Sequence, residues 1–374
     1  MHTRYFTLPL AALGLACALP AHAAITLAPP TSFSAGPLGT LSAQGILSAA
    51  GTWQGQPYPG NHSTRLDVTN AQMILQKSSG LVQFYVQAGA YNFPTLGEPI
   101  QRTASLVANT YGVVPEAYLT IAPSKGFSVE VGKLPTLVGT EMTWTWQNQN
   151  IERGLLWNDE NAVNRGVQVN LSHGPLALSL SVNDGFYSQR YDVLTGLATY
   201  TIDRANTASF SWYHRFGHSA VNTFVTPVVL DNADIYDLMY THTSGPWTIS
   251  PYLQYIVSPK AASLGFTKTE HAGGAAIIAD YQMTRMVSLA GRAEYETSSG
   301  ANSTTSANSN ILGFGPGSKA WSLTVTPTYQ DHGFFTRVEL SYVHVTNATA
   351  GDVFGAAGNR ANQVRAMLET GVTF

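Results

Sequence analysis

The chain has 374 residues, a formal net charge of −3 at neutral pH, and only 11% Asp, Glu, Lys and Arg. A typical soluble domain has about 25% charged residues, so this composition is unusual for a soluble protein. The slight excess of acidic residues argues against a nucleic-acid partner. After the first 23 residues there is no apolar run of about 18 residues, which excludes membrane-spanning helices from the rest of the chain.

The first 23 residues have the features of a secretory signal peptide. Arg4 gives a short positive start, and residues 6–19 form an apolar stretch that is too short to remain in a bilayer. Residues 21–23 read Ala-His-Ala, which is a cleavage site before residue 24. Cleavage leaves residues 24–374 as a single domain with 18 basic and 22 acidic residues, a net charge of −4.

The only cysteine, Cys17, lies inside this signal segment. A lipoprotein signal is the alternative interpretation, but it needs a Leu-like residue three positions earlier, where Gly14 stands. The mature chain therefore has no thiol for catalysis or metal binding and no disulfide. Zinc, calcium, phosphate-loop and nucleophile-elbow motifs are also missing from the sequence. We expect no metal, no cofactor and no enzymatic activity.

Short segments of alternating apolar and polar residues follow one another along the mature chain, as strands with one apolar face require. The pattern predicts sixteen strands, with fourteen or eighteen as alternatives. They are residues 41–53, 64–77, 81–91, 113–122, 127–134, 165–172, 176–183, 197–203, 207–216, 234–243, 247–257, 273–282, 286–296, 320–329, 334–345 and 362–374. The second segment changes face near residues 69–71, which indicates a bulge or a wrong register. The eighth is short.

The connections between these strands alternate between short and long. Tight links such as residues 123–126 and 243–246 are rich in Gly, Pro and Ser. The longer polar stretches are residues 54–63, 92–112, 135–164, 184–196, 217–233, 258–272, 297–319 and 346–361. A transmembrane barrel has short turns at one end and long loops at the other. The main alternative, a secreted soluble sandwich or solenoid, gives no reason for this regularity.

The last strand alternates as well and ends on an aromatic residue. Between Val364 and Phe374 the even positions are mainly apolar and the odd positions mainly polar. This ending resembles the closing strand of Gram-negative outer-membrane barrels, in which the terminal Phe is part of the assembly signal. The resemblance implies an all-β, antiparallel up-and-down barrel surrounded by outer-membrane lipid and lipopolysaccharide. It also implies insertion by the barrel-assembly machinery, which recognises the C-terminal strand.

The third long stretch, residues 135–164, concentrates aromatic and charged residues. They are Glu141, Trp144, Trp146, Glu152, Arg153, Trp157, Asp159 and Glu160. In general porins the third external loop folds into the barrel and narrows the pore, so the resemblance implies the same place for this segment. Its acidic excess would then set ion preference. The tryptophans could anchor the loop, stack on a sugar ring, or lie at the membrane interface.

Strand parity places nine further charged residues on the face that would line the lumen. They are Arg215, Arg292, Arg337, Arg365, Glu116, Glu130, Glu294, Glu339 and Glu369. Two interpretations stay open. The charges either neutralise one another across neighbouring strands, or the arginines form a basic ladder opposite the acidic loop and create a transverse field. Parity gives the face of a strand but not its position around a barrel.

Short motifs near the third long stretch give a closer family resemblance. They are Gly132-Lys133, Gly139-Thr140-Glu141, Arg153-Gly154-Leu155-Leu156, Asn164-Arg165-Gly166-Val167 and Val182-Asn183-Asp184-Gly185. These motifs are similar to those of the OmpL-like β-barrel porins. As a pattern of strands the resemblance covers most of the mature chain, but only residues 132–185 are fairly specific.

The resemblance implies an outer-membrane porin, that is, a passive water-filled channel for small hydrophilic solutes. It transfers no binding or catalytic site. Trimers are common among porins of this size, so a homotrimer is a further expectation, although no segment of the sequence indicates an interface. A channel selective for a sugar, an amino acid or a carboxylate is the first alternative. A barrel enzyme or an adhesion barrel is the second.

Overall fold

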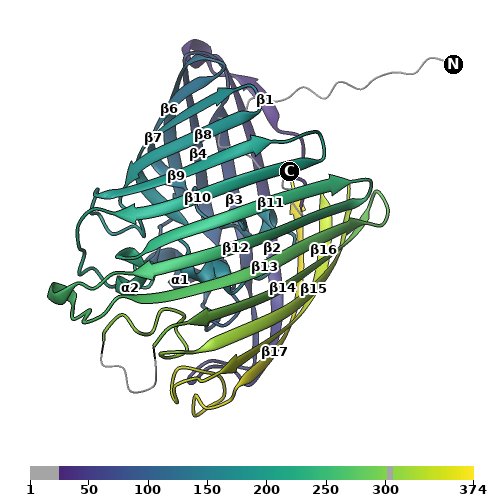
Figure 1. The fold of residues 1–374 in the computed structure, drawn as a ribbon. Coiled ribbons are helices and arrows are strands. Elements are labelled where there is room, and N and C mark those ends of the chain that lie inside the picture. The colour runs from purple at the N-terminus through teal and green to yellow at the C-terminus, as the bar shows by residue number, and fades with distance from the viewer. Residues whose placement is uncertain (1–24, 301–305) are drawn as a thin grey trace.

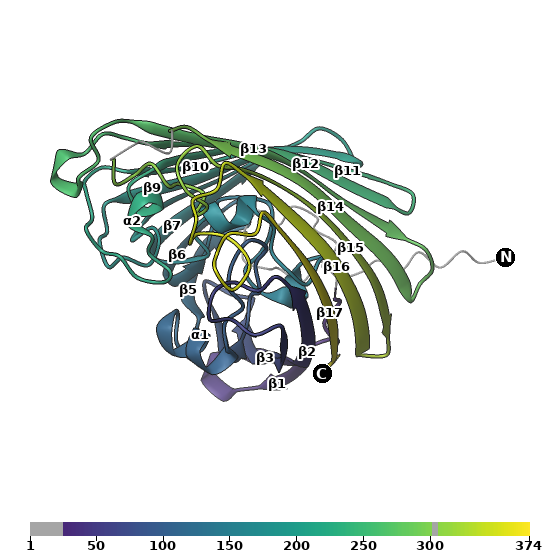
Figure 2. The same ribbon diagram turned by 90° about the horizontal axis from the view of Figure 1, so that it is seen from below.

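The computed structural model describes residues 25–300 and 306–374, so the expected signal peptide lies outside the described residues. Strands β2 to β17 form a closed antiparallel barrel of sixteen strands (Figures 1 and 2). The strands are β2 Thr40–Gly55, β3 Thr64–Lys77, β4 Val82–Tyr91, β5 Glu116–Ser124, β6 Phe127–Pro135, β7 Val163–His173, β8 Leu176–Asn183, β9 Val193–Thr201, β10 Asn206–Arg215, β11 Asp234–Ser244, β12 Trp247–Ser258, β13 Glu270–Gln282, β14 Val287–Ser298, β15 Lys319–Asp331, β16 Phe334–Thr346 and β17 Asn362–Thr373.

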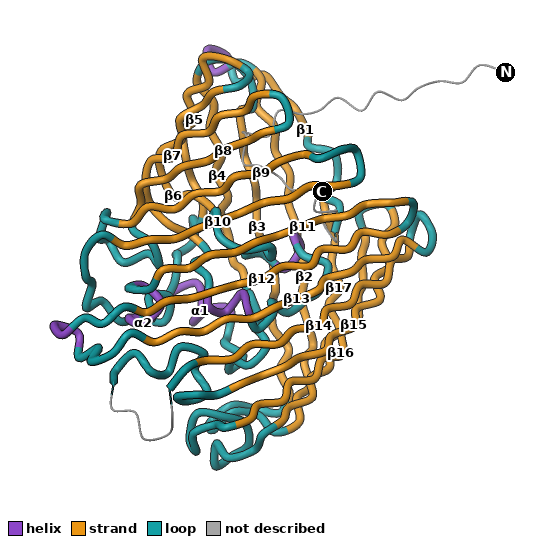
Figure 3. Tube along the Cα trace, viewed as in Figure 1, coloured by secondary structure: helices purple, strands orange, loops and turns teal. Residues whose placement is uncertain are grey.

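Each strand pairs with the next along the chain, and β17 closes the ring by pairing with β2 from Val364 opposite Gly55 to Thr373 opposite Ile46. The predicted fold class and the predicted number of strands are therefore confirmed. The largest error in position is in β9, which begins at Val193, four residues before the predicted start. Figure 3 shows the short turns at one end of the barrel and the long loops at the other.

Helices are few and short. They are α1 Thr103–Asn109, α2 Val228–Asp231, and the 3-10 turns η1 Gly36–Leu38, η2 Thr145–Gln147, η3 Leu156–Asp159 and η4 Ala262–Leu264. None of the helices in the described residues has the length and hydropathy needed to cross a membrane. All of them lie in connections or in the segment before β2.

The irregularity predicted near residues 69–71 is a β-bulge. In the pairing of β2 with β3, Ser48 lies opposite Asn70 and Ala49 lies opposite Val68, which leaves Thr69 as the extra residue. A bulge lets two successive side chains face the same way. Both Thr69 and Asn70 are buried, and both donate to the Glu369 carboxylate, at 2.6 and 3.3 Å. The apparent change of face therefore directs both side chains into the barrel, where they bind Glu369.

The two faces of the wall differ as a membrane barrel requires. On β7, Val167, Val169 and Leu171 point outward and are exposed, whereas Gln168 and Asn170 are buried on the lumen side. The outward face is the lipid-contacting surface, and the polar face lines the interior. The strands β5 to β8 have 8 to 11 residues and β13 to β17 have 12 or 13, so one side of the barrel is lower.

The segment before the barrel adds an element that the sequence pattern did not predict. Strand β1, Thr31–Ser34, pairs with the first residues of β2, beyond the point where β17 ends. Before it, the Ala28 N–H donates to Thr373 Oγ1 at 3.0 Å, and Thr26 exchanges two hydrogen bonds with the Gln330 side chain. Ile25 is fully buried, and its N–H donates to the Trp146 carbonyl at 3.3 Å.

The seam between β2 and β17 depends on a glycine. Gly45 and Phe374 exchange both backbone hydrogen bonds, at 2.6 and 3.0 Å, and a Cβ on Gly45 would lie 2.6 Å from the Phe374 ring. We predict that Gly45→Val destabilises the folded barrel by about 1–3 kcal/mol, the usual cost of overpacking. The measurement is the temperature at which the heat-modifiable folded band is lost on electrophoresis.

Gly51 on the same strand is the matched control, because nothing lies within 4 Å of a Cβ placed there. Gly51→Val should unfold at the temperature of the unaltered protein. Equal loss of stability in both variants would show that a clash with the Phe374 ring is not what destabilises Gly45→Val.

Candidate pore constriction

The third long connection, between β6 and β7, lies inside the barrel rather than outside it (Figure 2). Its residues contact inward-facing side chains of β14, β16 and β17, strands that are far from β6 and β7 around the ring. We call residues 136–162 the third loop. The contacts that hold it are mostly charged and fully buried.

Three arginines of the wall bind the third loop. Arg292 of β14 pairs with Glu141 at 2.6 Å, and Arg365 of β17 pairs with Glu152 at 2.8 Å. Arg337 of β16 pairs with Glu369 at 2.6 Å and also donates to the carbonyls of residues 145 and 148, at 2.8 and 2.9 Å. The arginines and the acidic loop are therefore in direct contact and neutralise one another. Of these three ion pairs, that of Arg337 with Glu369 joins neighbouring strands, whereas the other two join the wall to the loop.

Two carboxylates of the wall accept hydrogen bonds from backbone N–H groups of the same loop. Glu339 of β16 accepts hydrogen bonds from the amides of Ile151 and Glu152, the second at 2.9 Å. Glu294 of β14 accepts one from Leu156 at 3.4 Å and also pairs with Arg292 at 3.1 Å. A loop buried away from bulk water must satisfy its backbone groups, and these carboxylates do so.

Arg153 was expected among the charges at the pore constriction, but its side chain lies within the third loop. It is fully buried, and its guanidinium donates to four loop carbonyls, those of Met142, Thr143, Asn150 and Ile151. Its backbone forms a parallel bridge with Thr95 of the second long loop. Burial lowers the pKa of Arg153 to about 10, which leaves it charged at neutral pH. Arg153 therefore shapes the third loop from within.

The three tryptophans lie inside the barrel, which excludes the membrane interface, one of the three alternatives left open by the sequence. The indole of Trp144 donates to Glu116 at 3.0 Å, and that of Trp146 donates to Gln72 at 3.2 Å. Both rings are buried in a cluster with Tyr91 and Ile25. They anchor the third loop because each combines apolar contact with a hydrogen bond to the wall. Trp157 belongs to the same cluster and also lines a cavity.

Two of the predicted wall residues do not take part in holding the third loop. Arg215, at the end of β10, pairs with Asp231 at 2.5 Å and with Asp192, and so ties together two other long loops. Glu130 accepts a hydrogen bond from Gln168 at 3.2 Å on the neighbouring strand. Parity placed both on the lumen side, but only the tertiary structure separates them from the loop contacts.

A group of acidic residues remains without a cationic partner. They are Glu98, Asp159, Glu160, Asp237 and Glu296. Glu98 is half-buried and the other four are buried, and none forms an ion pair with another described residue. Sequence analysis named Asp159 and Glu160 but missed the other three. Parity alone would have found Asp237 and Glu296, because both face the lumen on strands that were predicted. Glu98 belongs to a loop, where no periodic signal exists.

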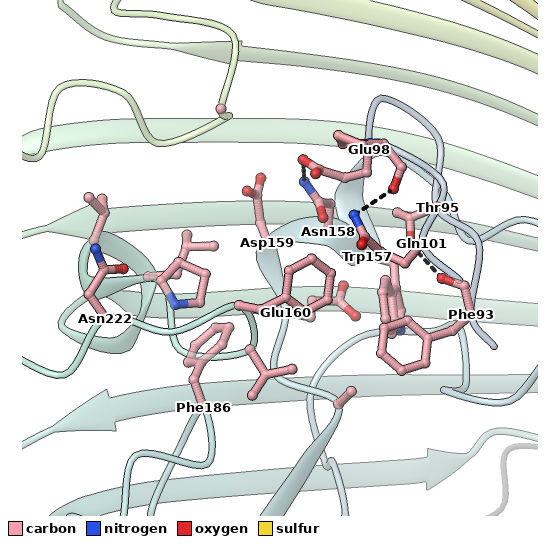
Figure 4. Close-up of a pocket in the computed structure, with 18 of the residues that line it drawn as sticks. Phe93, Thr95, Glu98, Gln101, Trp157, Asn158, Asp159, Glu160, Phe186 and Asn222 are labelled. Carbon is pink, nitrogen blue, oxygen red and sulfur yellow. Dashed lines mark hydrogen bonds between the residues drawn. The ribbon is translucent and has the colours of Figure 1, made fainter. Parts of the chain in front are cut away.

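Three of these carboxylates lie at a cavity of about 470 Å³ among the long loops (Figure 4). Glu98, Asp159 and Glu160 line it together with Phe93 and Trp157. Burial, with the nearby Glu98 carboxylate as a smaller cause, raises the pKa of Asp159. Within the described residues no group of His, Cys, Asp and Glu side chains has the geometry to hold a metal ion.

A closed sixteen-strand barrel with an apolar outer face, a polar interior and a loop folded into its lumen defines an outer-membrane channel protein. Residues 40–374 match the family described as "Putative beta-barrel porin-2, OmpL-like". The chain therefore belongs to this family of β-barrel porins and is a protein of the Gram-negative outer membrane. No curated protein matches the sequence.

Several solved structures share the fold. OmpF of Salmonella typhi, solved in complex with daunomycin, is 10% identical, with 90% of this chain and 98% of that chain covered and a TM-score of 0.60. In-vitro folded OmpT, an outer membrane protein of Vibrio cholerae, is 11% identical, with 91% and 98% covered and a TM-score of 0.56. OprD of Pseudomonas aeruginosa is 11% identical, with 93% and 97% covered and a TM-score of 0.50. Identities this low establish a shared fold alone.

The pair of Arg365 and Glu152 gives a test of the loop attachment. Removing one partner of a buried ion pair leaves an unpaired charge and costs about 3–5 kcal/mol. We predict that Arg365→Gln lowers the stability of the folded barrel by an amount in this range and makes its single-channel current noisier. The double variant Arg365→Gln/Glu152→Gln should recover part of the lost stability, because no lone charge remains.

Lys125, in an exposed turn, is the matched control for this experiment. Lys125→Gln should leave both the unfolding temperature and the current noise unchanged. If Arg365→Gln behaved like Lys125→Gln, the ion pair with Glu152 would not hold the third loop.

Proposed function

We propose that the protein is a passive porin for small hydrophilic solutes and that its narrowest part is formed by the third loop. The observation that carries the proposal is the set of buried attachments between this loop and the wall at Arg292, Arg337 and Arg365. A loop bound at several points across the lumen narrows the channel without closing a gate. Flux then follows the concentration gradient and needs no energy source or cofactor.

We further propose that the channel prefers cations. The wall arginines are compensated by acidic partners, so they contribute little net potential to the lumen. Glu98, Asp159, Glu160, Asp237 and Glu296 have no such partners. In their ionised form, carboxyl groups without a cationic partner attract cations and raise the local concentration of cations in a narrow passage with low-dielectric walls.

Planar-bilayer recording of the refolded mature protein tests both statements. We expect stable open steps and, in a salt gradient, a reversal potential of the sign that marks cation preference. The double variant Asp237→Asn/Glu296→Gln should move the reversal potential toward zero, because it removes two acidic groups that have no cationic partner in the lumen. Asp203→Asn, in the exposed turn between β9 and β10, is the control and should change nothing.

An anion-type reversal potential would refute the cation preference and leave the porin in place. A folded protein that never conducts would refute the porin and favour the barrel enzyme or the adhesion barrel. Catalysis is not part of the proposal, because the family that matches residues 40–374 is described as a family of porins.

A homotrimer is the third part of the proposal. OmpT of Vibrio cholerae has been solved in a trimer form, and it shares the fold of this chain. The low wall of β5 to β8 suits contact with a second copy. Its strongly exposed large apolar side chains are all aliphatic: Leu119, Ile121, Val131, Val167, Val169, Leu171, Leu176, Leu178, Leu180 and Val182. The higher wall carries exposed aromatic residues such as Tyr295 and Trp321, as lipid-facing surfaces do.

We predict that Leu178→Asn converts the trimer to folded monomers, because a polar side chain is placed in the proposed interface. Leu323→Asn, on the outward face of β15, is the matched control and should leave the trimer intact. The measurement is semi-native electrophoresis with and without chemical cross-linking. A monomeric unaltered protein would overturn the trimer, and dissociation by both variants would refute the location of the interface on the low wall.

A further inference from the structure

The cavity among the long loops brings acidic and aromatic groups together (Figure 4). It lies on the long-loop side of the third loop, because all of its lining residues come from long connections or from α1 and α2. Phe93, Trp157 and Phe186 supply aromatic surface. Its volume, about 470 Å³, is in the range of small-molecule sites, roughly 300–1,000 Å³.

Asp159 is the unusual group in this cavity. Its side chain is only 2% exposed, and its carboxylate has no hydrogen-bond partner among the described residues. Figure 4 shows this carboxylate extending into the cavity, on the same side as the carboxylate of Glu98. A buried charge without a donor is unfavourable unless a partner is supplied. A cation entering from outside would supply that partner.

Other acids of the same loop show what a structural carboxylate looks like in this protein. Glu141 and Glu152 are equally buried, and each is bound by a wall arginine, at 2.6 and 2.8 Å. No arginine or lysine pairs with Asp159 in the described part of the chain, and Glu296 on the wall strand beside it is unpaired too. The third loop is therefore neutralised where it is held and carries carboxyl groups without a cationic partner where it meets the cavity.

The surroundings of Asp159 favour an organic cation over a metal ion. The described residues include no metal-ligating cluster, so the carboxylates do not converge as inner ligands. Glu98 is held at a fixed place by the Asn158 amide, at 3.0 Å. The rings of Trp157 and Phe186 offer π faces and apolar surface, which an ammonium group on a hydrocarbon chain uses well.

We propose that this cavity is a binding site for small organic cations that carry primary ammonium groups on an aliphatic chain. Asp159 is the principal counter-ion, Glu98 the second, and the aromatic side chains contact the chain of the ligand. The inference rests on the proposed porin function, because occupancy of the cavity by such a solute precedes its passage along the third loop. It makes the channel substrate-selective for this chemical class.

The probe is cadaverine, a five-carbon diamine, added to the long-loop side of single channels in a planar bilayer. We expect brief concentration-dependent blocks of the current, and a blocking constant at least tenfold weaker in Asp159→Asn. 1,5-Pentanediol has the same carbon chain without charge and should not block. Asp352→Asn, in another long loop, removes an acid away from the cavity and should leave the block unchanged.

Asp159→Glu keeps the charge and should restore most of the block, which separates loss of a counter-ion from a folding defect. Heat-modifiable electrophoresis verifies that each variant is folded. The proposal is overturned if cadaverine blocks the Asp159→Asn channel as strongly as the unaltered channel. It is also overturned if 1,5-pentanediol blocks the unaltered channel as strongly as cadaverine does.

Equilibrium binding of cadaverine to the detergent-folded protein, measured by calorimetry, separates this inference from the proposed function. If the protein conducts and selects cations but neither binds cadaverine nor is blocked by it, the binding site is refuted and the porin function stands. If the protein never conducts but binds cadaverine through Asp159, the porin function is refuted and the binding site stands.

Discussion

Closure of the sheet by β17 on β2 is the constraint on which every other feature of this protein depends. In a bilayer the backbone N–H and C=O groups have no water to bind, so an open edge in lipid is excluded. The ten paired residues from Val364 to Thr373 remove the last edge, and the backbone exchange of Gly45 with Phe374 extends the seam to the end of the strand. A closed ring of sixteen strands has an interior wide enough to hold a folded loop.

Charge inside that ring is arranged in two regions. Arg292, Arg337 and Arg365 meet acidic side chains and loop carbonyls, and this buried, compensated region fixes the third loop. Toward the long loops, the acids around Asp159 face a cavity without such partners. A buried pair mainly fixes geometry, whereas an unpaired charge acts on solutes. The same residue type therefore has a structural role in one region and a proposed selective role in the other.

Much of the barrel followed from periodicity, because a wall between lipid and a polar lumen imposes the same alternation on every strand. Even the irregularity near Thr69 was visible as a change of face, and it proved to be a bulge that turns Thr69 and Asn70 toward Glu369. Loops carry no such period. The burial of the tryptophans, the internal role of Arg153 and the approach of Ile25 to Trp146 had no signal in the pattern.

The sequence by itself determined the class of fold, the number of strands, the side of the wall on which each charge lies and the family. It could do so because each of these depends on neighbours along one strand or on short motifs. Only the tertiary structure decided that Arg292 meets Glu141 and Arg365 meets Glu152, while Asp159 meets no cation. Those contacts depend on the angular position of each strand and on the path of a loop through the lumen, and parity contains neither.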